Sequence, residues 1–328
     1  MELLPFERTK RNLFVKKESE TNWDYGLKPE ERSVNELINY GVINLNKFSG
    51  PTSHQISDYT QRILGIKHAG HSGTLDPGVT GVLPIALERA RRIVQVLLKA
   101  GKEYICLMHL HKNIDEDLIK KTAEEFVGKI KQLPPIRSAV KRQLRTREIY
   151  YLKILEIENK EILFKVGSEA GFYVRKFCHD WGLKLNTNAH MSELVRTKAG
   201  PFTDKTWHNL HDLKDAYTLY KENNEEKYIR KVILPIERAV EHLPKIWVLD
   251  SCVFNLTHGA DLSIPGISKY NNFDKNETIA VMTLKNELIG IGDSIIDYNE
   301  LNKLDYGKSV KINKVFMETS LYPKFRQE

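Results

Sequence analysis

The sequence predicts an α+β fold in which a mixed-sheet domain is followed by a small β-barrel domain. Helical and strand-like segments alternate over the first part of the chain without a strict βαβ repeat, whereas the remainder consists of short strands and turns. The 328 residues suffice for two or three domains that each bury a core. We therefore expect an N-terminal arm (1–39) that packs on the second domain, a first domain (40–243) and a second domain (244–328), with a boundary at Leu243-Pro244.

Apolar spacing and capping residues predict the elements of the first domain in order. After a strand over 40–46, Thr52 or Ser53 can cap a helix that has Ile56 and Ile63 on its apolar face and ends at Gly65. The elements that follow are a helix over 86–98, a strand over 102–110, a helix over 115–127, a hairpin of 149–157 with 161–166, a helix over 172–185 and a strand over 189–197.

The second domain is predicted from shorter segments. A strand over 245–249 and a brief helix over 251–256 are followed by turn-rich sequence, and a hairpin of 278–284 with 287–292 turns at Lys285-Asn286. Short strands separated by turns are typical of a small β-barrel.

The charge of the chain indicates the class of its partner. It has 50 Lys and Arg against 43 Asp and Glu, and the resulting net charge of +7 favours polyanions, RNA or DNA first. Basic residues gather at 89–99 and at 137–147, although each group is equally consistent with a solvated face.

Two features of the composition bound the location of the protein. No stretch reaches the roughly 20 apolar residues of a membrane-spanning helix, and charged residues at 7–10 interrupt the apolar N-terminus, so a cytoplasmic location is expected. The cysteines are far apart and form no CxxC pair, so neither a disulfide framework nor a zinc ribbon is expected. We expect Cys106, Cys178 and Cys252 to be small buried apolar residues.

The glycine-rich segment GHSGTLDP at 70–77 carries the strongest chemical signal. Its glycines let a ligand approach closely and Pro77 restricts Asp76 to extended backbone, so the loop can hold one carboxylate in the orientation that a nucleophile or general base needs. A plain Asx turn before proline is the alternative. The segment lacks the Gly-Lys-Ser/Thr of a P-loop and the GxGxxG spacing of a dinucleotide site, and no second acid stands nearby to form a glycosidase pair.

Metal catalysis fits the sequence poorly. His109 and His111 could lie on one face of a strand, but no third ligand of matching spacing is evident. We expect a structural or RNA-contacting role for both histidines.

Ordered motifs over residues 40–206 resemble the catalytic domain of the TruB-type pseudouridine synthases. They are GVINLNK (41–47), GPTSH (50–54), AGHSGTLDP (69–77), VTGVLP (79–84), KEY (102–104), LPPIRSAVKR (133–142), YVRK (173–176) and RTKAGPF (196–202). LMHLH (107–111) and the Arg-rich run at 140–147 resemble the dyskerin branch, in its archaeal type, more than the bacterial transfer-RNA enzymes. Residues 244–320 resemble the PUA domain, an RNA-binding β-barrel.

The resemblance implies roles in converting uridine in RNA to its C-glycoside isomer. It assigns Asp76 as the essential carboxylate, which either attacks covalently or removes a sugar proton. It assigns Tyr104 as the aromatic residue that stacks on an extruded base and serves as acid or base, and Arg175 as the partner of Asp76. Tyr173 and Leu194 are expected to line the same pocket.

Two further positions follow from the same resemblance. His54 matches a histidine that contacts substrate RNA near the flipped nucleotide. Phe172 is a departure, because family members usually have a threonine there. We expect the larger Phe172 to pack inward and to leave Arg175 in register.

The remaining expectations concern RNA. The segment 134–147 resembles a flexible loop that closes over substrate RNA, and the second domain resembles PUA domains that grip an RNA tail. The residues expected to bind RNA there are Arg137, Lys141, Arg142, Arg145, Arg147, Gly259 and Ala260.

The resemblance also implies the partners. They are an H/ACA guide RNA, a ribosomal or transfer RNA substrate and the three other core H/ACA proteins, while no cofactor and no metal is implied because isomerisation needs neither redox nor an energy source. One alternative is a transfer-RNA pseudouridine synthase that acts alone, without a guide. The other is a non-catalytic RNA-binding scaffold, which would not need Asp76, Tyr104 and Arg175 together.

Overall fold

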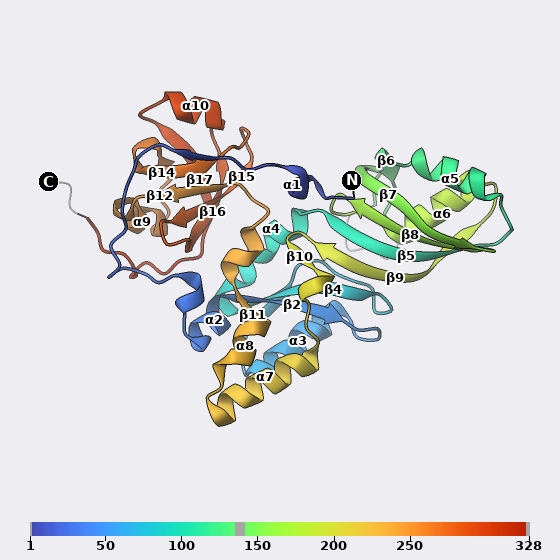
Figure 1. Ribbon diagram of the computed structural model, residues 1–328, viewed down its shortest axis with the longest axis horizontal. Coiled ribbons are helices and arrows are strands. Elements are labelled where there is room, and N and C mark those ends of the chain that lie inside the picture. The colour runs from blue at the N-terminus through green and yellow to red at the C-terminus, as the bar shows by residue number, and fades with distance from the viewer. Residues whose placement is uncertain (1, 135–141, 326–328) are drawn as a thin grey trace. The chain divides into compact units, whose positions relative to one another are not determined.

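The computed structural model describes residues 2–134 and 142–325. The chain forms two compact units, each with its own sheet (Figure 1). The first unit comprises residues 2–8, 43–87, 91–134 and 142–232, and the second comprises 9–42, 88–90 and 233–325. Helices and strands occur in both units, and the predicted α+β class is confirmed.

The sheet of the first unit is mixed. Its strands run in the order β2-β4-β9-β5-β8-β7-β6, with β3 paired to β4 and β10 paired to β9. The pairing of β4 with β9 is parallel, whereas β5 pairs antiparallel with both β8 and β9. The strands are β2 (Gly41–Lys47), β3 (Ala69–His71), β4 (Thr80–Leu87), β5 (Lys102–Leu110), β6 (Gly128–Gln132), β7 (Arg145–Glu158), β8 (Glu161–Ser168), β9 (Ala189–Ala199) and β10 (Phe202–Thr203).

Helix α6 covers one face of this sheet. Phe177 and Trp181 of α6 are fully buried in one apolar cluster with Cys106 and Met108 of β5, so every second residue of β5 faces this helix. The helices of the unit are α1 (Pro5–Arg8), α3 (Ser53–Leu64), α4 (Val94–Lys99), α5 (Glu116–Glu124), α6 (Val174–Lys184), α7 (Leu210–Asn223) and α8 (Glu226–Val232), with 3-10 turns η2 (Glu88–Ile93) and η3 (Asp204–Thr206).

The predicted helix after the first strand is confirmed, including both of its ends. Thr52 accepts a hydrogen bond from the backbone of Gln55, and the Gln55 side chain accepts one from the backbone of Thr52. This capping box satisfies two of the amide groups that a helix leaves without partners at its start. Gly65 ends the helix in the left-handed conformation, with φ 64°.

Two predictions about the first domain are wrong. A single helix over 86–98 does not form, because Ala86 and Leu87 pair with β3 and the chain then turns at Glu88, whose φ is +37°, into η2 and α4. Arg145 and Arg147 do not lie in a loop, because β7 begins at Arg145 and pairs there with β6. In both places strand pairing, which local spacing does not report, decides the structure.

The second unit contains a seven-stranded sheet in the order β1-β14-β12-β15-β16-β17-β13. The predicted hairpin is confirmed as β15 and β16, and Asn286 in its turn has φ 67°. The elements of this unit are β1 (Leu13–Val15), β11 (Ile233–Pro235), β12 (Lys245–Val248), β13 (Leu262–Ser263), β14 (Ile267–Asn271), β15 (Thr278–Thr283), β16 (Leu288–Ser294), β17 (Lys308–Val315), α2 (Val34–Tyr40), α9 (Asp250–Thr257), α10 (Tyr298–Lys303), η1 (Pro29–Glu31), η4 (Ile236–Val240) and η5 (Ile264–Gly266).

The expected N-terminal arm is divided between the units. Residues 2–8 belong to the first unit and residues 9–39 to the second. In the second unit β1 pairs antiparallel with β14, and Phe14 stacks on Tyr270 with ring centroids 5.4 Å apart. The arm therefore adds an edge strand to the seven-stranded sheet.

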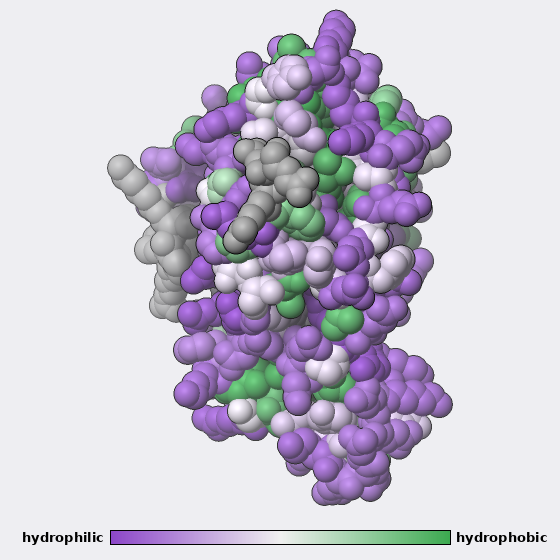
Figure 2. All heavy atoms as spheres, turned by 90° about the vertical axis from the view of Figure 1, so that its left-hand side faces the viewer, coloured by the Kyte–Doolittle hydropathy of each residue, from purple (hydrophilic) through white to green (hydrophobic). Residues whose placement is uncertain are grey.

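Figure 2 shows a face of the molecule on which hydrophilic side chains dominate and hydrophobic residues form only small separate groups. Among the described residues, no helix has the length and apolar character needed to cross a bilayer.

Candidate active site

The glycine-rich loop lies between β3 and β4, and the start of α3 fixes its centre. The buried Ser53 hydroxyl accepts a hydrogen bond from the Leu75 amide at 2.9 Å and lies 3.2 Å from the Leu75 carbonyl, to which it donates. The Gly50 amide donates to the Pro77 carbonyl at 2.9 Å. The residues on both sides of Asp76 therefore have fixed backbone partners.

Lys47 binds the loop after Asp76. Its side chain is buried at the end of β2, and its Nζ donates to the carbonyls of Phe48 at 3.0 Å, Pro77 at 2.9 Å and Val79 at 2.8 Å. Burial lowers the pKa of Lys47, and the negative charge of Asp76 opposes that shift. All three donors of the ammonium are therefore bound to carbonyl oxygens of the chain directly beside the candidate carboxylate.

Arg196 binds the loop before Asp76. This arginine of β9 is buried, and it donates through Nη2 to the Gly73 carbonyl at 3.1 Å and through Nε to the Val82 carbonyl at 2.7 Å. Gly81 is required at the β4–β9 contact, because a Cβ there would lie 2.3 Å from the Arg196 carbonyl oxygen. Two buried cations thus bracket the loop from either side of Asp76.

Asp76 and Arg175 meet although they lie 99 positions apart in the sequence. Arg175 Nη2 is 2.6 Å from Asp76 Oδ2, which is a single hydrogen-bonded contact rather than the two-bond pairing that a guanidinium can make with a carboxylate. The two side chains are 55% and 60% exposed, so the pair faces solvent. A charged hydrogen bond of this length orients the carboxylate while leaving Oδ1 open to a reactant.

The first turn of α6 carries Arg175 and is held by β6. The buried Gln132 side chain accepts a hydrogen bond from the Tyr173 amide at 3.0 Å and donates to the Tyr173 carbonyl at 3.2 Å. Phe172 is 7% exposed and packs on Phe177, with ring centroids 5.6 Å apart. The expectation that Phe172 packs inward is confirmed, and the arginine is kept at the start of the helix.

Tyr104 and Leu194 lie on neighbouring strands. Both are half-buried against the cluster beneath α6, Tyr104 from β5 and Leu194 from β9. Tyr104 is paired across the strands with Arg196, and it raises the pKa of that guanidinium, opposing the effect of burial. The guanidinium that binds the Gly73 carbonyl is therefore the direct cross-strand neighbour of Tyr104.

His54 lies beside His71, a residue of the loop motif that was not among the predicted site residues. The two rings meet edge to face, with centroids 4.8 Å apart. Burial, and after it the positive charges of His54 and Arg196, lowers the pKa of His71 to about 4. His71 is therefore neutral at pH 7, and among the described atoms its Nδ1 has no hydrogen-bond partner.

The structure describes three of the five basic residues expected on the closing loop, Arg142, Arg145 and Arg147. Arg137 and Lys141 lie outside the described residues, and Arg142 is exposed. Arg147 lies 3.8 Å from Glu169 and against Gly171, where an added Cβ would come within 3.0 Å of its Nε. Arg147 is therefore adjacent to the segment that leads into Tyr173 and Arg175.

The two residues expected to contact an RNA tail lie in the second unit, after α9. Gly259 and Ala260 are exposed, and their amides donate to the Leu256 and Asn255 carbonyls at 3.0 Å each. Gly259 has φ 89°, a conformation that favours glycine.

His109 and His111, for which the sequence predicted no metal site, lie close to a third histidine, His190 of β9. His111 Nε2 is 3.1 Å from His190 Nδ1, and His109 Nδ1 is 2.5 Å from Glu161 Oε1. Within residues 2–134 and 142–325, no three His, Cys, Asp or Glu side chains are arranged to hold a metal ion.

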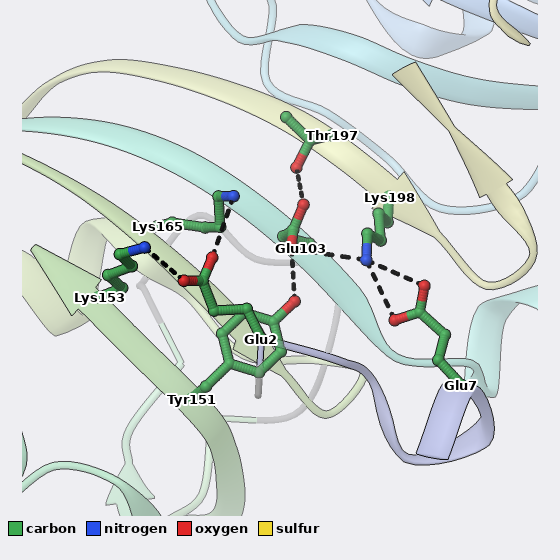
Figure 3. A network of polar contacts seen from close by, with 8 residues as sticks. All are labelled: Glu2, Glu7, Glu103, Tyr151, Lys153, Lys165, Thr197 and Lys198. Carbon is green, nitrogen blue, oxygen red and sulfur yellow. Dashed lines mark hydrogen bonds and ion pairs between the residues drawn. The ribbon is translucent and has the colours of Figure 1, made fainter. Parts of the chain in front are cut away.

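A polar network surrounds Glu103 of β5 (Figure 3). Because successive residues of a strand point to opposite faces, Glu103 lies on the face of β5 opposite Tyr104. Glu103 accepts hydrogen bonds from Thr197 Oγ1 at 2.8 Å and from Tyr151 Oη at 2.5 Å. Lys198 bridges Glu103 and Glu7, at 3.7 Å and 2.9 Å. The network attaches α1 to the strands that carry Tyr104 and Arg196.

Sequence reasoning missed several residues that hold the site together. Lys47, Ser53 and Arg196 all stand inside motifs that were recognised, but Lys47 and Arg196 were assigned no role and Ser53 was considered only as a helix cap. Their common signal is a polar side chain in an otherwise apolar strand or capping position, which is costly to bury without a partner. The partners are carbonyls of the loop, and only the fold reveals them.

Four known domain families match the chain. The TruB family pseudouridylate synthase (N terminal domain) matches residues 61–174, and the tRNA pseudouridylate synthase B C-terminal domain matches residues 175–241. The DKCLD (NUC011) domain matches residues 3–57 and the PUA domain matches residues 244–316.

Similar proteins extend over nearly the whole chain. A probable tRNA pseudouridine synthase B of Pyrococcus furiosus is 52% identical over 318 residues, covering 96% of this chain and 94% of that protein. The protein of the same name in Nanoarchaeum equitans is 50% identical over 322 residues, covering 98% and 92%.

Two solved structures are similar in fold over the same length. One is an H/ACA RNP bound to a substrate RNA containing 2′-deoxyuridine, with a TM-score of 0.93, 48% identity and coverage of 98% of this chain and 99% of that chain. The other is a Cbf5-Nop10-Gar1 complex, with a TM-score of 0.95, 51% identity and the same coverage.

Proposed function

Because the chain belongs to the TruB family, as a dyskerin-type pseudouridine synthase with a PUA domain, we propose that it acts as the catalytic subunit of an H/ACA guide ribonucleoprotein. In this role it isomerises specific uridines of ribosomal RNA that a guide RNA selects. The catalytic domain comprises residues 40–243 and the PUA domain residues 244–328, with residues 9–39 of the N-terminal arm packed on the latter.

The Asp76–Arg175 pair carries this proposal. The reaction breaks the bond between N1 of uracil and C1′ of the sugar, forms a bond between C5 and C1′, and exchanges the C5 proton for one on N1. A carboxylate fixed by one guanidinium contact at 2.6 Å, with its second oxygen open, suits either covalent attack or proton removal.

The surrounding residues support the same chemistry. Tyr104 offers a ring for an unstacked base and a hydroxyl for proton transfer, and Leu194 and Tyr173 complete the pocket. His54 contacts the RNA beside the flipped nucleotide.

The RNA-binding residues are assigned by charge and backbone exposure. Phosphate neutralisation falls to the basic group of Arg137, Lys141, Arg142, Arg145 and Arg147. In the PUA domain the exposed backbone at Gly259 and Ala260 receives a single-stranded RNA tail.

The similar structures support the proposed partners. One of them is an H/ACA RNP with a substrate RNA and another contains Nop10 and Gar1. We assign to this chain a guide RNA, its substrate RNA and three further core proteins.

A second candidate is a transfer-RNA pseudouridine synthase that acts without a guide. It is favoured by the names of the relatives, which are probable tRNA pseudouridine synthases B. The two functions use the same active site and differ only in how the uridine is selected.

One reconstitution experiment separates these candidates. The purified chain is incubated with a target RNA that contains 5-tritiated uridine, with and without the guide RNA and partner proteins, and in parallel with a transfer-RNA transcript. Tritium release only with guide and partners supports the ribonucleoprotein, whereas release from transfer RNA by the chain alone supports the second candidate. Release in no reaction contradicts both.

A further inference from the structure

Arg196 is a buried cation whose described hydrogen bonds go only to uncharged oxygens. The residue is 2% exposed, and it donates to the Val82 carbonyl at 2.7 Å and to the Gly73 carbonyl at 3.1 Å, while Tyr104 is its cross-strand neighbour. Burial lowers the pKa of Arg196, and Tyr104 opposes the shift. A buried charge without a carboxylate is costly, so a side chain that serves only packing would be better apolar.

The carboxylate next to Tyr104 in the chain does not serve Arg196. Successive residues of a strand point to opposite faces, and Glu103 points away from the face that carries Tyr104. Both of its oxygens accept hydrogen bonds, from Thr197 and from Tyr151 (Figure 3). Glu103 therefore binds Thr197 and Tyr151 on one face of β5, while the charge of Arg196 lies on the opposite face, with Tyr104.

A β-bulge brings Tyr104 and Arg196 together. Glu103 pairs with Lys198 and Tyr104 pairs with Arg196, so Thr197 is the extra residue in β9. A bulge redirects the side chains that follow it, and directly paired residues have Cβ atoms about 4.5–5.5 Å apart. The Thr197–Glu103 hydrogen bond, at 2.8 Å, holds the extra residue in place.

From this geometry we propose that Arg196 is the positioning residue of Tyr104, directing the tyrosine hydroxyl proton toward the substrate base. A guanidinium has donors and no acceptor, so in a hydrogen bond between the two paired side chains Arg196 donates to the phenolic oxygen. The hydroxyl proton of Tyr104 is then available to a second acceptor, the substrate base. Because the same guanidinium donates to the Gly73 carbonyl, it also fixes the tyrosine relative to the loop that carries Asp76.

This inference rests on the proposed role of Tyr104, and a double-mutant cycle tests it. Arg196→Met, Arg196→Lys and Tyr104→Phe, alone and combined, are assayed in the full chain under whichever reconstitution conditions support tritium release by wild type. Single-turnover rates and RNA dissociation constants are both measured.

The expected result is strong coupling between the two residues. Arg196→Met lowers the single-turnover rate by at least about 100-fold, the lower end of what general acid–base groups contribute, with RNA affinity changed less than about threefold. In the Tyr104→Phe background the same substitution costs less than about fivefold, because the hydroxyl that it positions is already absent. Tyr104→Phe and Arg196→Met also lose the same limb of the pH–rate profile.

Thr197→Val is the matched control, in the same strand but facing Glu103. It weakens the network of Figure 3, so its effect on rate adds to that of Tyr104→Phe and leaves the shape of the pH–rate profile unchanged. If Arg196→Met fails to fold, the cycle with Arg196→Lys decides, since lysine keeps the charge.

Additive effects of Arg196 and Tyr104 substitutions overturn the inference and leave Arg196 as a support of the loop. A Tyr104→Phe variant as fast as wild type overturns it as well. Neither result touches the proposed function, because that is judged by the tritium release of the wild-type protein.

Discussion

The lowered pKa of the buried Lys102 can be tested through the pH dependence of protein stability. Its buried ammonium donates to the carbonyls of Leu97 at 3.0 Å, Leu98 at 2.8 Å and Ala100 at 2.6 Å, at the end of α4. Burial, and after it the positive charge of Arg196, lowers the pKa of Lys102 to about 7 from 10.5. The substitution Lys102→Met removes this titrating group and keeps the length of the side chain.

The sign and size of the effect follow from proton binding. Between pH 7 and pH 10.5 the unfolded chain holds a proton that folded Lys102 has released, so stability rises with pH across this window. Each unit of pKa difference corresponds to about 1.4 kcal/mol, and the rise from pH 7 to pH 9 comes to about 2 kcal/mol. Below pH 7 both states are protonated, and the contribution no longer changes.

Urea denaturation at several pH values measures this rise. Trp181 is buried in the first unit and reports its unfolding by fluorescence. The free energy of unfolding of wild type minus that of Lys102→Met is expected to increase by about 2 kcal/mol between pH 7 and pH 9. Lys99→Met, at an exposed lysine of α4, corrects for the loss of one charge from the chain. A difference that stays level over this range would show that Lys102 remains charged in the folded protein.

Three further substitutions test how the site is built. Gly81→Ala places a Cβ 2.3 Å from the Arg196 carbonyl oxygen at φ 109°, and we expect at least about 3 kcal/mol of destabilisation or failure to fold in thermal melts. Gly78→Ala, with nothing within 4 Å, is the control, and equal melting temperatures for the two variants would contradict the expectation. Thr52→Ala removes the α3 cap and should cost about 1 kcal/mol in urea unfolding, while Thr52→Ser should restore it; a loss that serine does not rescue would speak against the cap. Lys47→Met leaves three loop carbonyls without the donor that the lysine supplies. Because Asp76 is then misplaced, single-turnover pseudouridine formation should slow by about 10- to 100-fold, whereas Lys99→Met should keep the wild-type rate. An unchanged rate in Lys47→Met would mean that the loop holds its shape without the lysine.

Elements with local signals were predictable from the sequence. The helix that begins at Ser53 has its stop at Gly65, and the hairpin turns at Asn159 and Asn286 have φ values of 54° and 67°. In each case the residue in the special conformation is one whose chemistry favours it, so a short window of sequence suffices.

Elements decided by distant pairing were not predictable in the same way. The apolar run that includes Ala86 and Leu87 has a spacing compatible with a helix, but pairing with β3 makes it a strand. Arg145 and Arg147 have few apolar neighbours in sequence, yet pairing with β6 draws them into β7. Neither partner strand can be identified from the residues next to these positions.

The candidate site shows the same division. The loop around Asp76 could be singled out from its glycines and proline, but its contact with Arg175 joins residues 99 positions apart and came only from family resemblance. In the sequence, Arg196 is one of two Lys or Arg residues in its strand, and nothing there marks it as buried. Its burial is visible only once β4, β5 and β9 are assembled around it.

Single-turnover kinetics of Asp76→Asn beside Asp58→Asn would decide whether the carboxylate at residue 76 performs the reaction. Asp58 is an exposed aspartate of α3 and serves as a matched loss of one carboxylate. With RNA at saturation, Asp76→Asn should form pseudouridine at least about 1,000-fold more slowly than wild type while binding RNA equally well, and Asp58→Asn should match wild type. Pseudouridine formation by Asp76→Asn at a rate near that of wild type would contradict the assignment of the reaction to this loop.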